Sequence, residues 1–356
     1  MAAVSPRPEL WEQQARNRRN TVVVITAFVL LLFALGLGVD WFLWGRMDAE
    51  GRAPFVPIAA SIALVVGLFQ ALGGYFWGDR AVLAATRARL VRASSLAPGQ
   101  QLIPGEPTGA REQTLINVVQ EMSLASGLPM PNVYVVPDPD PNAFAVGRNP
   151  EHASIAVTEG LLERLDRAEL QGVVAHELAH VRNFDIRTMT LVAALLGAVV
   201  LLSDLTQRWM WWGGGRGGRG RDRDGDRSGG GGALGIVVLV LWLVLIVVAP
   251  LLGQLMAMAV SRSREYDADA SGAEFTRNPL GLASALKKID EATDPTRSIG
   301  RGAAHLCIAD PLGRAVNDRE GGVATLFATH PPIQKRIAML EAMAGAGAQP
   351  EAARAT

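Results

Sequence analysis

Four apolar stretches divide this chain and limit its possible folds more than any other feature. Residues 21–39 and 53–78 contain no charged side chain, and residues 233–252 form an unbroken apolar run. About 20 apolar residues in a helix suffice to cross a bilayer, so these three stretches predict membrane spans. Residues 188–203 are shorter and predict either a fourth span or a tilted, partly buried helix. The first stretch is too long for a signal-peptide core and has no convincing cleavage site after it, so we interpret it as a retained anchor.

Arginines near the span ends predict the orientation, because cytoplasmic loops carry an excess of Lys and Arg. Four arginines precede the first span and four follow the second: Arg7, Arg16, Arg18, Arg19, Arg80, Arg87, Arg89 and Arg92. Both flanking segments are therefore predicted to be cytoplasmic. The loop at 208–232 conflicts with this orientation, because it holds six arginines and would lie on the side of the membrane opposite to the cytoplasm. We keep the cytoplasmic orientation because the two earlier loops agree with each other.

The composition of the loop at 208–232, rich in Gly, Arg and Asp, cannot build a core and predicts disorder. An RGG-like nucleic-acid-binding loop is the less favoured alternative. The chain as a whole has 34 basic and 34 acidic residues, so no global field attracts nucleic acid, and we expect no nucleic-acid partner. Its single cysteine, Cys307, excludes a disulfide framework and is expected to be a small buried apolar residue.

Short strands and amphipathic helices are predicted outside the spans. The segment "RAVLAATRARLVRAS" is typical of a helix that leaves the membrane, and "REQTLINVVQEMSLASGL" of an amphipathic helix that ends at Gly127. Three short apolar runs, "NVYVVP", "NAFAVG" and "SIAVT", predict strands. Asp166 and Glu169 predict a capping box at the start of the next helix.

The predicted fold class is therefore a membrane protein of the α+β type, with about four transmembrane helices and a mostly helical soluble part with a small β-sheet. We divide the chain into a segment with two spans (1–79), a first cytoplasmic part (80–186), a membrane hairpin (187–260), a second cytoplasmic part (261–340) and a disordered tail (341–356).

The sequence His176-Glu177-Leu178-Ala179-His180 fits the pattern H-E-x-x-H. Residues four apart share one face of a helix, so both imidazoles can bind one zinc ion. Glu177 would then act as general base on a water that the metal activates. A chance pentapeptide is disfavoured because the motif lies within a well-patterned apolar helix.

The third ligand must come from another part of the chain. The extended pattern H-E-x-x-H-x-x-G-x-x-H is rejected because Asn183 and Ile186 occupy its last two fixed positions. In "SRSREYDADA", Glu265 could ligate, and Asp269 one turn later could accept the free N–H of a ligand histidine. A solvated acidic helix face is the alternative for this segment. Two membrane crossings separate His180 from Glu265 and return the chain to the same side, so the two residues can meet.

The sequence resembles the HtpX-type membrane zinc metalloproteases, relatives of the CAAX prenyl proteases. The stretches that carry the resemblance are "GLPMPNVYVV", "PNAFAVGRNPEHASIAVTEGLLERLDRAELQGVVAHELAHVRNFDIR", "SREYDADASGA" and "THPPIQKRI". The resemblance covers the chain from Arg80 to about Leu340. It implies a zinc endopeptidase at the cytoplasmic face of a bacterial-type inner membrane, with His176, His180 and Glu265 as ligands and Glu177 as acid/base.

The resemblance also implies a strand along which a substrate peptide docks, formed by Asn142, Ala143, Phe144, Ala145 and Val146. An ordinary half-buried strand is the alternative for these residues. His330 is expected either to stabilise the oxyanion, to latch the open zinc position or to hold a turn before Pro331. His152 and His305 are expected to be structural, and Asp185 a polar residue at the membrane boundary.

The function predicted from the sequence is quality-control proteolysis, with one zinc ion per chain and with membrane or unfolded proteins as substrates beside the lipid bilayer. A dedicated processing protease for one membrane or lipidated substrate is an alternative. A zinc-binding membrane scaffold that does not cut is a further alternative, although it would have no use for Glu177.

Overall fold

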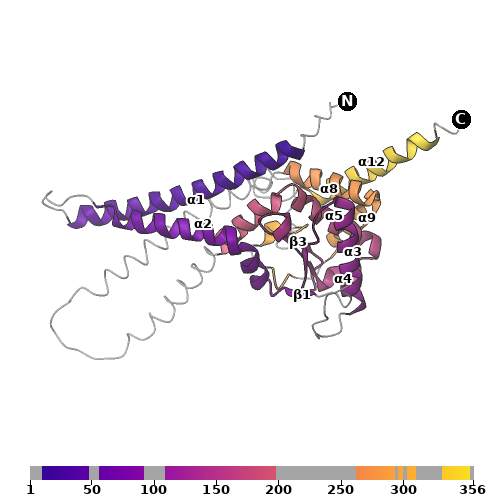
Figure 1. Ribbon diagram of the computed structural model, residues 1–356, viewed down its shortest axis with the longest axis horizontal. Coiled ribbons are helices and arrows are strands. Elements are labelled where there is room, and N and C mark those ends of the chain that lie inside the picture. Colours follow the sequence, from indigo (N-terminus) through magenta and orange to yellow (C-terminus); the bar gives the residue numbers. More distant parts are fainter. Residues whose placement is uncertain are drawn as a thin grey trace.

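Two long helices extend from one side of a helical head that contains a small sheet (Figure 1). A computed structural model describes residues 10–47, 56–91, 109–197, 262–292, 296–299, 303–309 and 331–352 of the chain. The first long helix is α1 (Leu10–Met47) and the second is α2 (Ile58–Ala85), and both are long and apolar enough to cross a membrane. Large apolar side chains on their outer faces are exposed, as at Phe69, which is 72% exposed. Exposure of this kind suits lipid better than water.

A third helix packs against this pair. Residues 185–197 are helical, and their buried side chains, including Leu191 and Leu195, contact Phe28 of α1 and Ala71 of α2. This segment is the described part of the predicted span at 188–203, and it packs within the protein rather than standing alone. The predicted span at 233–252 and the loop at 208–232 lie outside the described residues.

Asp40 fixes the end of the helix pair that is far from the head. Its two carboxylate oxygens accept the backbone N–H groups of Ala59 and Ala60, each at 2.8 Å. The first N–H groups of a helix have no partner within the helix, so this carboxylate caps α2 from the neighbouring helix.

The sheet has four strands in the order β1-β2-β4-β3, with bounds β1 (Arg89–Val91), β2 (Asn132–Val136), β3 (Ala143–Val146) and β4 (Ser154–Thr158). The central pair β2 and β4 is parallel, and both outer pairs are antiparallel. The prediction of a continuous helix through "RAVLAATRARLVRAS" was wrong for its second half. Arg87 adopts φ +56° after α2 ends, and this reversal turns the chain into β1.

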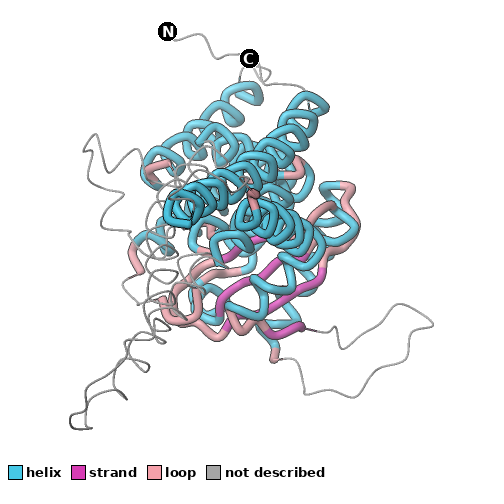
Figure 2. Tube along the Cα trace, turned by 90° about the vertical axis from the view of Figure 1, so that its left-hand side faces the viewer, coloured by secondary structure: helices cyan, strands magenta, loops and turns pink. Residues whose placement is uncertain are grey.

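Helices cover the sheet and form most of the head (Figure 2). Their bounds are α3 (Ala110–Ser126), α4 (Glu159–Arg164), α5 (Arg167–Arg182), α8 (Arg262–Thr276), α9 (Pro279–Asp290) and α12 (Ile333–Ala352), with short 3-10 turns at Pro150–His152 and Ala304–Leu306. Two predicted helix ends are confirmed. Gly127 ends α3 at φ +70°, and Asp166 and Glu169 form the capping box of α5.

The helix α5 forms the centre of the head, since it is buried from Gly172 to Val181. It packs against α3, α8 and α9, and against β3. Glycines allow two of these contacts to be very close. A Cβ at Gly172 would lie 2.7 Å from the backbone N of Leu282 in α9, and one at Gly272 of α8 would lie 3.1 Å from the backbone N of His176.

The prediction of a disordered tail from residue 341 was wrong over its first part, because α12 continues to Ala352. The segment "EAMAGAGAQPEA" contains five alanines, and alanine is the residue with the highest helix propensity. Its two glycines and Pro350 lower that propensity but do not end the helix. A helix that has already formed needs no new nucleation to extend into the next residues.

We predict that Gly172→Ala destabilises the protein, because the new methyl group would push α5 away from the backbone of α9. Overpacking of this kind typically costs about 1–3 kcal/mol of unfolding free energy. Gly345→Ala in α12 is the control, since a Cβ there meets nothing within 4 Å and alanine favours a helix. Thermal unfolding in detergent checks both variants, and an unchanged midpoint for Gly172→Ala would contradict the close contact.

Candidate metal centre

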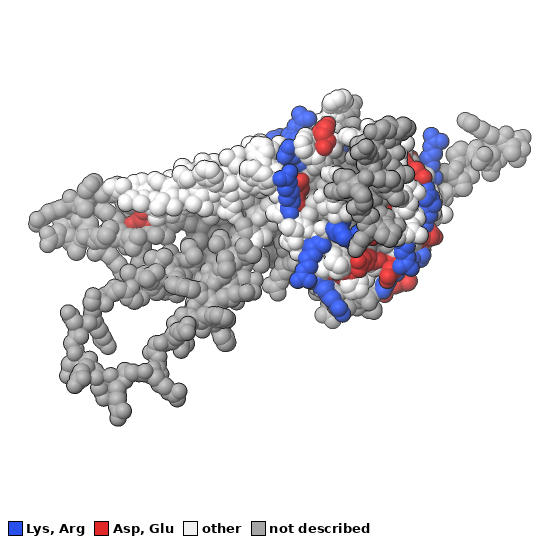
Figure 3. Space-filling view, turned by 60° about the horizontal axis from the view of Figure 1, so that its bottom comes forward, with Lys and Arg blue, Asp and Glu red and all other residues white. Residues whose placement is uncertain are grey.

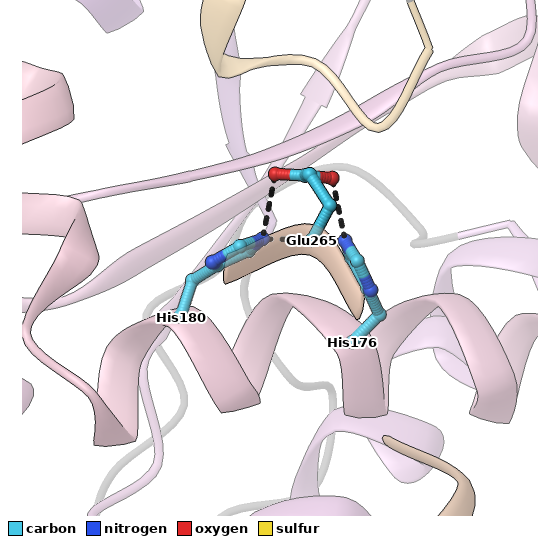
Figure 4. Close-up of side chains that lie close together, drawn as sticks. All are labelled: His176, His180 and Glu265. Atoms are coloured by element: carbon cyan, nitrogen blue, oxygen red, sulfur yellow. Dashed lines mark hydrogen bonds and ion pairs between the residues drawn. The ribbon is translucent and has the colours of Figure 1, made fainter. Parts of the chain in front are cut away.

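The two histidines of the H-E-x-x-H motif point from one face of α5 toward a common point (Figure 4). Their Nε2 atoms lie 3.2 Å apart, and the rings meet edge to face. The i and i+4 spacing puts both side chains one above the other on the helix surface. Burial of the whole helix turn then holds both imidazoles away from bulk water.

Glu265 faces the two histidines from α8, as predicted. One carboxylate oxygen lies 3.6 Å from His180 Nε2, and the other lies 3.7 Å from His176 Nε2. Ligand atoms around a tetrahedral zinc ion, with bonds of about 2.0–2.1 Å, stand about 3.3 Å from one another. The three side chains are buried, and their ligand atoms fit such an ion with a small contraction. Three protein ligands of this type leave a fourth position for a reactant.

Each histidine is held from behind by a carboxylate. Asp269 Oδ1 lies 2.9 Å from His176 Nδ1, and Asp185 Oδ2 lies 3.1 Å from His180 Nδ1. A carboxylate at Nδ1 favours the tautomer with the proton there and leaves the Nε2 lone pair for a metal ion. Asp269 was predicted to accept the free N–H of a ligand histidine, and this contact with His176 Nδ1 is the one that such a role requires. Asp185 was predicted only as a polar residue at the membrane boundary, and its contact with the second histidine was not foreseen.

A sequence signal for Asp185 existed. Metal-ligating histidines generally need an acceptor at the second ring nitrogen, and that rule applies to both histidines of the motif. Asp185 lies five residues after His180, beyond the end of α5, so helical spacing does not place it. Phe184 adopts φ +61° in the intervening turn, and this uncommon conformation brings the carboxylate back to the ring.

Sequence analysis also missed Arg336 of α12, which is 1% exposed. Its guanidinium donates to both oxygens of Asp269, at 2.7 and 2.8 Å, and to the carbonyl of Ile308 at 2.8 Å. Burial disfavours the charged form of Asp269, but the charge and hydrogen bonds of Arg336 outweigh it and lower the Asp269 pKa to about 2. Asp269 therefore stays ionised beside His176.

The charge around this centre also fits a divalent cation. Four carboxylates and two guanidinium groups gather there, from Glu177, Asp185, Glu265, Asp269, Arg264 and Arg336. Metal binding requires neutral histidines, and with all four carboxylates ionised these groups then leave two negative charges in a buried environment, where unbalanced charge is costly. A divalent cation would neutralise them.

Proton binding to His180 and Glu177 reflects the same environment. Burial opposes a charged His180, but the hydrogen bond to Asp185 and the charge of Glu265 raise its pKa to about 9. Burial lowers the pKa of His176, since Asp269 only partly compensates. Burial raises the pKa of Glu177 to about 7, although its hydrogen bond to the Ala145 backbone opposes the shift. A carboxylate with such a pKa can exchange protons near neutral pH.

The predicted substrate strand lies at the edge of the sheet, beside α5. β3 begins at Ala143, and Asn142 precedes it. Part of its outer edge is occupied, because Ile308 N–H donates to the Ala143 carbonyl at 2.9 Å and Phe144 bridges to Cys307. Asn142 donates to the Ala309 carbonyl at 3.0 Å. In the part of the chain that the structure describes, no strand pairs with the outer edge at 145–146.

Of the other histidines, His330 lies outside the described residues. His305 is buried with Nε2 3.2 Å from the Met189 carbonyl, and His152 is exposed beside Asn149, so both lie away from the metal ligands. Cys307 is buried, as predicted.

Comparison with known proteins identifies the family. The family model described as Peptidase family M48 matches residues 109–344, which include the motif, Glu265, Asp269 and Arg336. The chain belongs to peptidase family M48. Two relatives, each named Protease HtpX homolog, match nearly the whole chain. The one from Thermoanaerobacter pseudethanolicus is 41% identical over 338 residues, or 95% of this chain and 99% of the relative. The one from Streptococcus gordonii is 39% identical over 334 residues, or 94% of this chain and 100% of the relative.

A solved structure, the crystal structure of S. mikatae Ste24p, aligns with a TM-score of 0.43 at 14% identity. It covers 93% of this chain and 66% of that chain. A structural similarity at this level supports no conclusion about this chain. The full-length matches show that this M48 chain is an HtpX homologue and a metallopeptidase, with its metal-binding triad at His176, His180 and Glu265.

We predict that zinc affinity weakens as the pH falls. His180 holds a proton below its pKa of about 9, and zinc must displace that proton, whereas the lowered pKa of His176 leaves its ring neutral. Release of one proton weakens the apparent affinity about tenfold for each pH unit between pH 8 and 6. Competition against a chelator of known pH dependence measures how steeply the apparent zinc affinity changes with pH. A constant affinity over this range would show that His180 is already neutral in the metal-free protein.

We predict that Arg336→Met strongly destabilises the fold, because it leaves Asp269 buried without its cation. Breaking a buried ion pair by removing one partner costs about 3–5 kcal/mol. Lys287→Met is the control, since it removes an exposed ion pair with Glu341 between α9 and α12, and such pairs contribute about 0–1 kcal/mol. Denaturant unfolding of both variants tests the contrast, and equal losses would contradict it.

Proposed function

We propose that this chain is a membrane-bound, zinc-dependent endopeptidase that cleaves membrane or misfolded proteins at the cytoplasmic face of a bacterial-type inner membrane. The observation that carries the proposal is the link between the general base and the sheet edge. The Ala145 backbone is among the groups that lower the pKa of Glu177, and α5, which carries Glu177 and two of the three metal ligands, packs against β3. A proton acceptor, a metal triad and an edge strand of the sheet therefore lie together.

Zinc bound by these ligands would activate a water molecule and polarise the scissile carbonyl. Glu177 would take the proton from that water and deliver it to the leaving amine, because a pKa of about 7 suits both transfers. Asp269 and Asp185 would keep the two imidazoles in the orientation that ligation requires.

An extended substrate would pair with the outer edge of β3 through main-chain hydrogen bonds. The outer edge nearest Glu177 is at Ala145, whereas the edge at Ala143 and Phe144 already contacts 307–308, and the Gly147 N–H donates to the Thr190 hydroxyl at 2.9 Å. A substrate strand that pairs along this edge would therefore displace the contacts of 307–308. Main-chain recognition accepts many sequences, which suits a protease of broad specificity.

The position of the metal centre supports substrates near a membrane. His180 lies one turn from residues 185–197, which pack on the two apolar helices. Figure 3 shows Lys and Arg side chains gathered where the apolar pair meets the head. Exposed Arg16, Arg19 and Arg80 lie near the head ends of α1 and α2, and positive charge is typical of a cytoplasmic boundary.

We expect Glu177→Gln to retain zinc and to lose casein cleavage by at least about a hundredfold, because the amide cannot accept a proton. The measurement is zinc content together with casein cleavage by the full chain in detergent. Glu163→Gln on α4 is the control and should cut like wild type, since both side chains of the Glu163–Arg111 ion pair are exposed.

If both wild type and Glu177→Gln bind zinc and neither cleaves casein, the result favours a non-cutting scaffold, or a latch such as the one predicted for His330. Zinc absent from both would overturn the ligand assignment.

A further inference from the structure

The first turns of α1 lie on the head before the helix becomes apolar. Gln14 donates to the Arg182 carbonyl at 2.9 Å, and Asn17 donates to the Asn183 carbonyl at 2.8 Å. One turn later the hydroxyls of Thr21 and Thr188 lie 2.8 Å apart. Asn17 and Thr21 are four residues apart on one face of the helix, and each is only 4% exposed. This face of α1 is therefore a built contact.

The contact falls on the turn that ends α5. The last carbonyls of a helix have no partner within the helix, and α1 supplies donors to two such groups in this turn. The ring of Phe184, at φ +61°, lies between the guanidinium groups of Arg18 and Arg187, each 5.1 Å from its centroid. A left-handed conformation at a bulky residue persists only where its surroundings hold it. α1 supplies part of those surroundings.

The same turn carries the carboxylate that supports the metal site. Asp185 is 1% exposed; Oδ2 lies 3.1 Å from His180 Nδ1, and Oδ1 accepts Asn17 Nδ2 at 2.6 Å. Arg264 of α8 is 3.6 Å from that second oxygen, a distance too long for a hydrogen bond. The amide of Asn17 thus fixes one oxygen of the carboxylate while His180 uses the other.

We propose that Asn17 is a positioning residue of the metal centre, which acts through Asp185 on His180. The chain of contacts runs from the membrane helix α1 to a zinc ligand without a gap. Metal affinity then depends on the hydrogen bond that Asn17 of α1 donates to Asp185. The proposal rests on the metal site of the proposed function, and it adds that the anchor helix is part of that site's support.

The test is zinc affinity of the full chain in detergent, measured by chelator competition. Asn17→Leu keeps the branched shape of the side chain but cannot donate, and we expect it to weaken zinc binding about tenfold, within the range known for outer partners of metal ligands. Gln14→Leu removes the neighbouring contact of α1 without touching Asp185, and we expect it to bind zinc within about twofold of wild type. Thermal unfolding of the metal-free variants shows that each one folds.

A double-mutant cycle separates this role from general stability. If Asn17 acts through Asp185, then adding Asn17→Leu to Asp185→Ala should weaken zinc binding no further, because the carboxylate that Asn17 positions is gone. Additive losses, or an unchanged zinc affinity in Asn17→Leu, would overturn the proposal. So would an equal loss in Gln14→Leu.

If the leucine variant does not fold, Asn17→Ser replaces it in the test. The shorter serine hydroxyl cannot reach Asp185 directly, so this variant should also weaken zinc binding, by a smaller factor than leucine. Wild-type zinc affinity in Asn17→Ser would overturn the proposal. Wild type that binds no zinc would instead overturn the metal site itself.

Discussion

Ionised groups buried away from water require partners, and the centre of this molecule is arranged around that requirement. Four carboxylates and two guanidinium groups meet beside two imidazoles inside the head. Every element that supplies one of these groups must hold its position, because a displaced partner would leave a buried charge unbalanced. The close packing of α5 against α8, with Gly272 against His176, follows from the same need.

The partners come from widely separated parts of the chain. α5 supplies both histidines and Glu177, α8 supplies Glu265 and Asp269, and α12 supplies Arg336. The amide of Asn17 reaches the site from a helix that begins at residue 10. A metal centre assembled in this way joins the membrane helices to the catalytic head.

The small sheet of the head matters more for the position of its edge strand β3 than for its size. β3 lies at the edge of the sheet, and its outer edge, which faces away from β4, lies beside the helix that carries Glu177. Arg336 links this edge to the ligands, because it binds Asp269 and the Ile308 carbonyl together. Movement of 307–309 would therefore be transmitted to His176 through three contacts: Ile308 to Arg336, Arg336 to Asp269, and Asp269 to His176.

Local patterns in the sequence determined the motif helix, its capping box, the strands β2, β3 and β4, and the two long apolar helices, since each depends on neighbours within a few residues. They also placed Glu265 and Asp269, because helical spacing relates those two residues to each other. Only the tertiary structure placed Asp185, Arg336 and Asn17. Asp185 follows a left-handed turn that no periodicity encodes. Asn17 and Arg336 contact residues that are more than 150 positions away in the sequence: Asn17 is 168 positions from Asp185, and Arg336 is 160 positions from His176. Contacts of that kind arise from packing of whole elements, which a single sequence does not display.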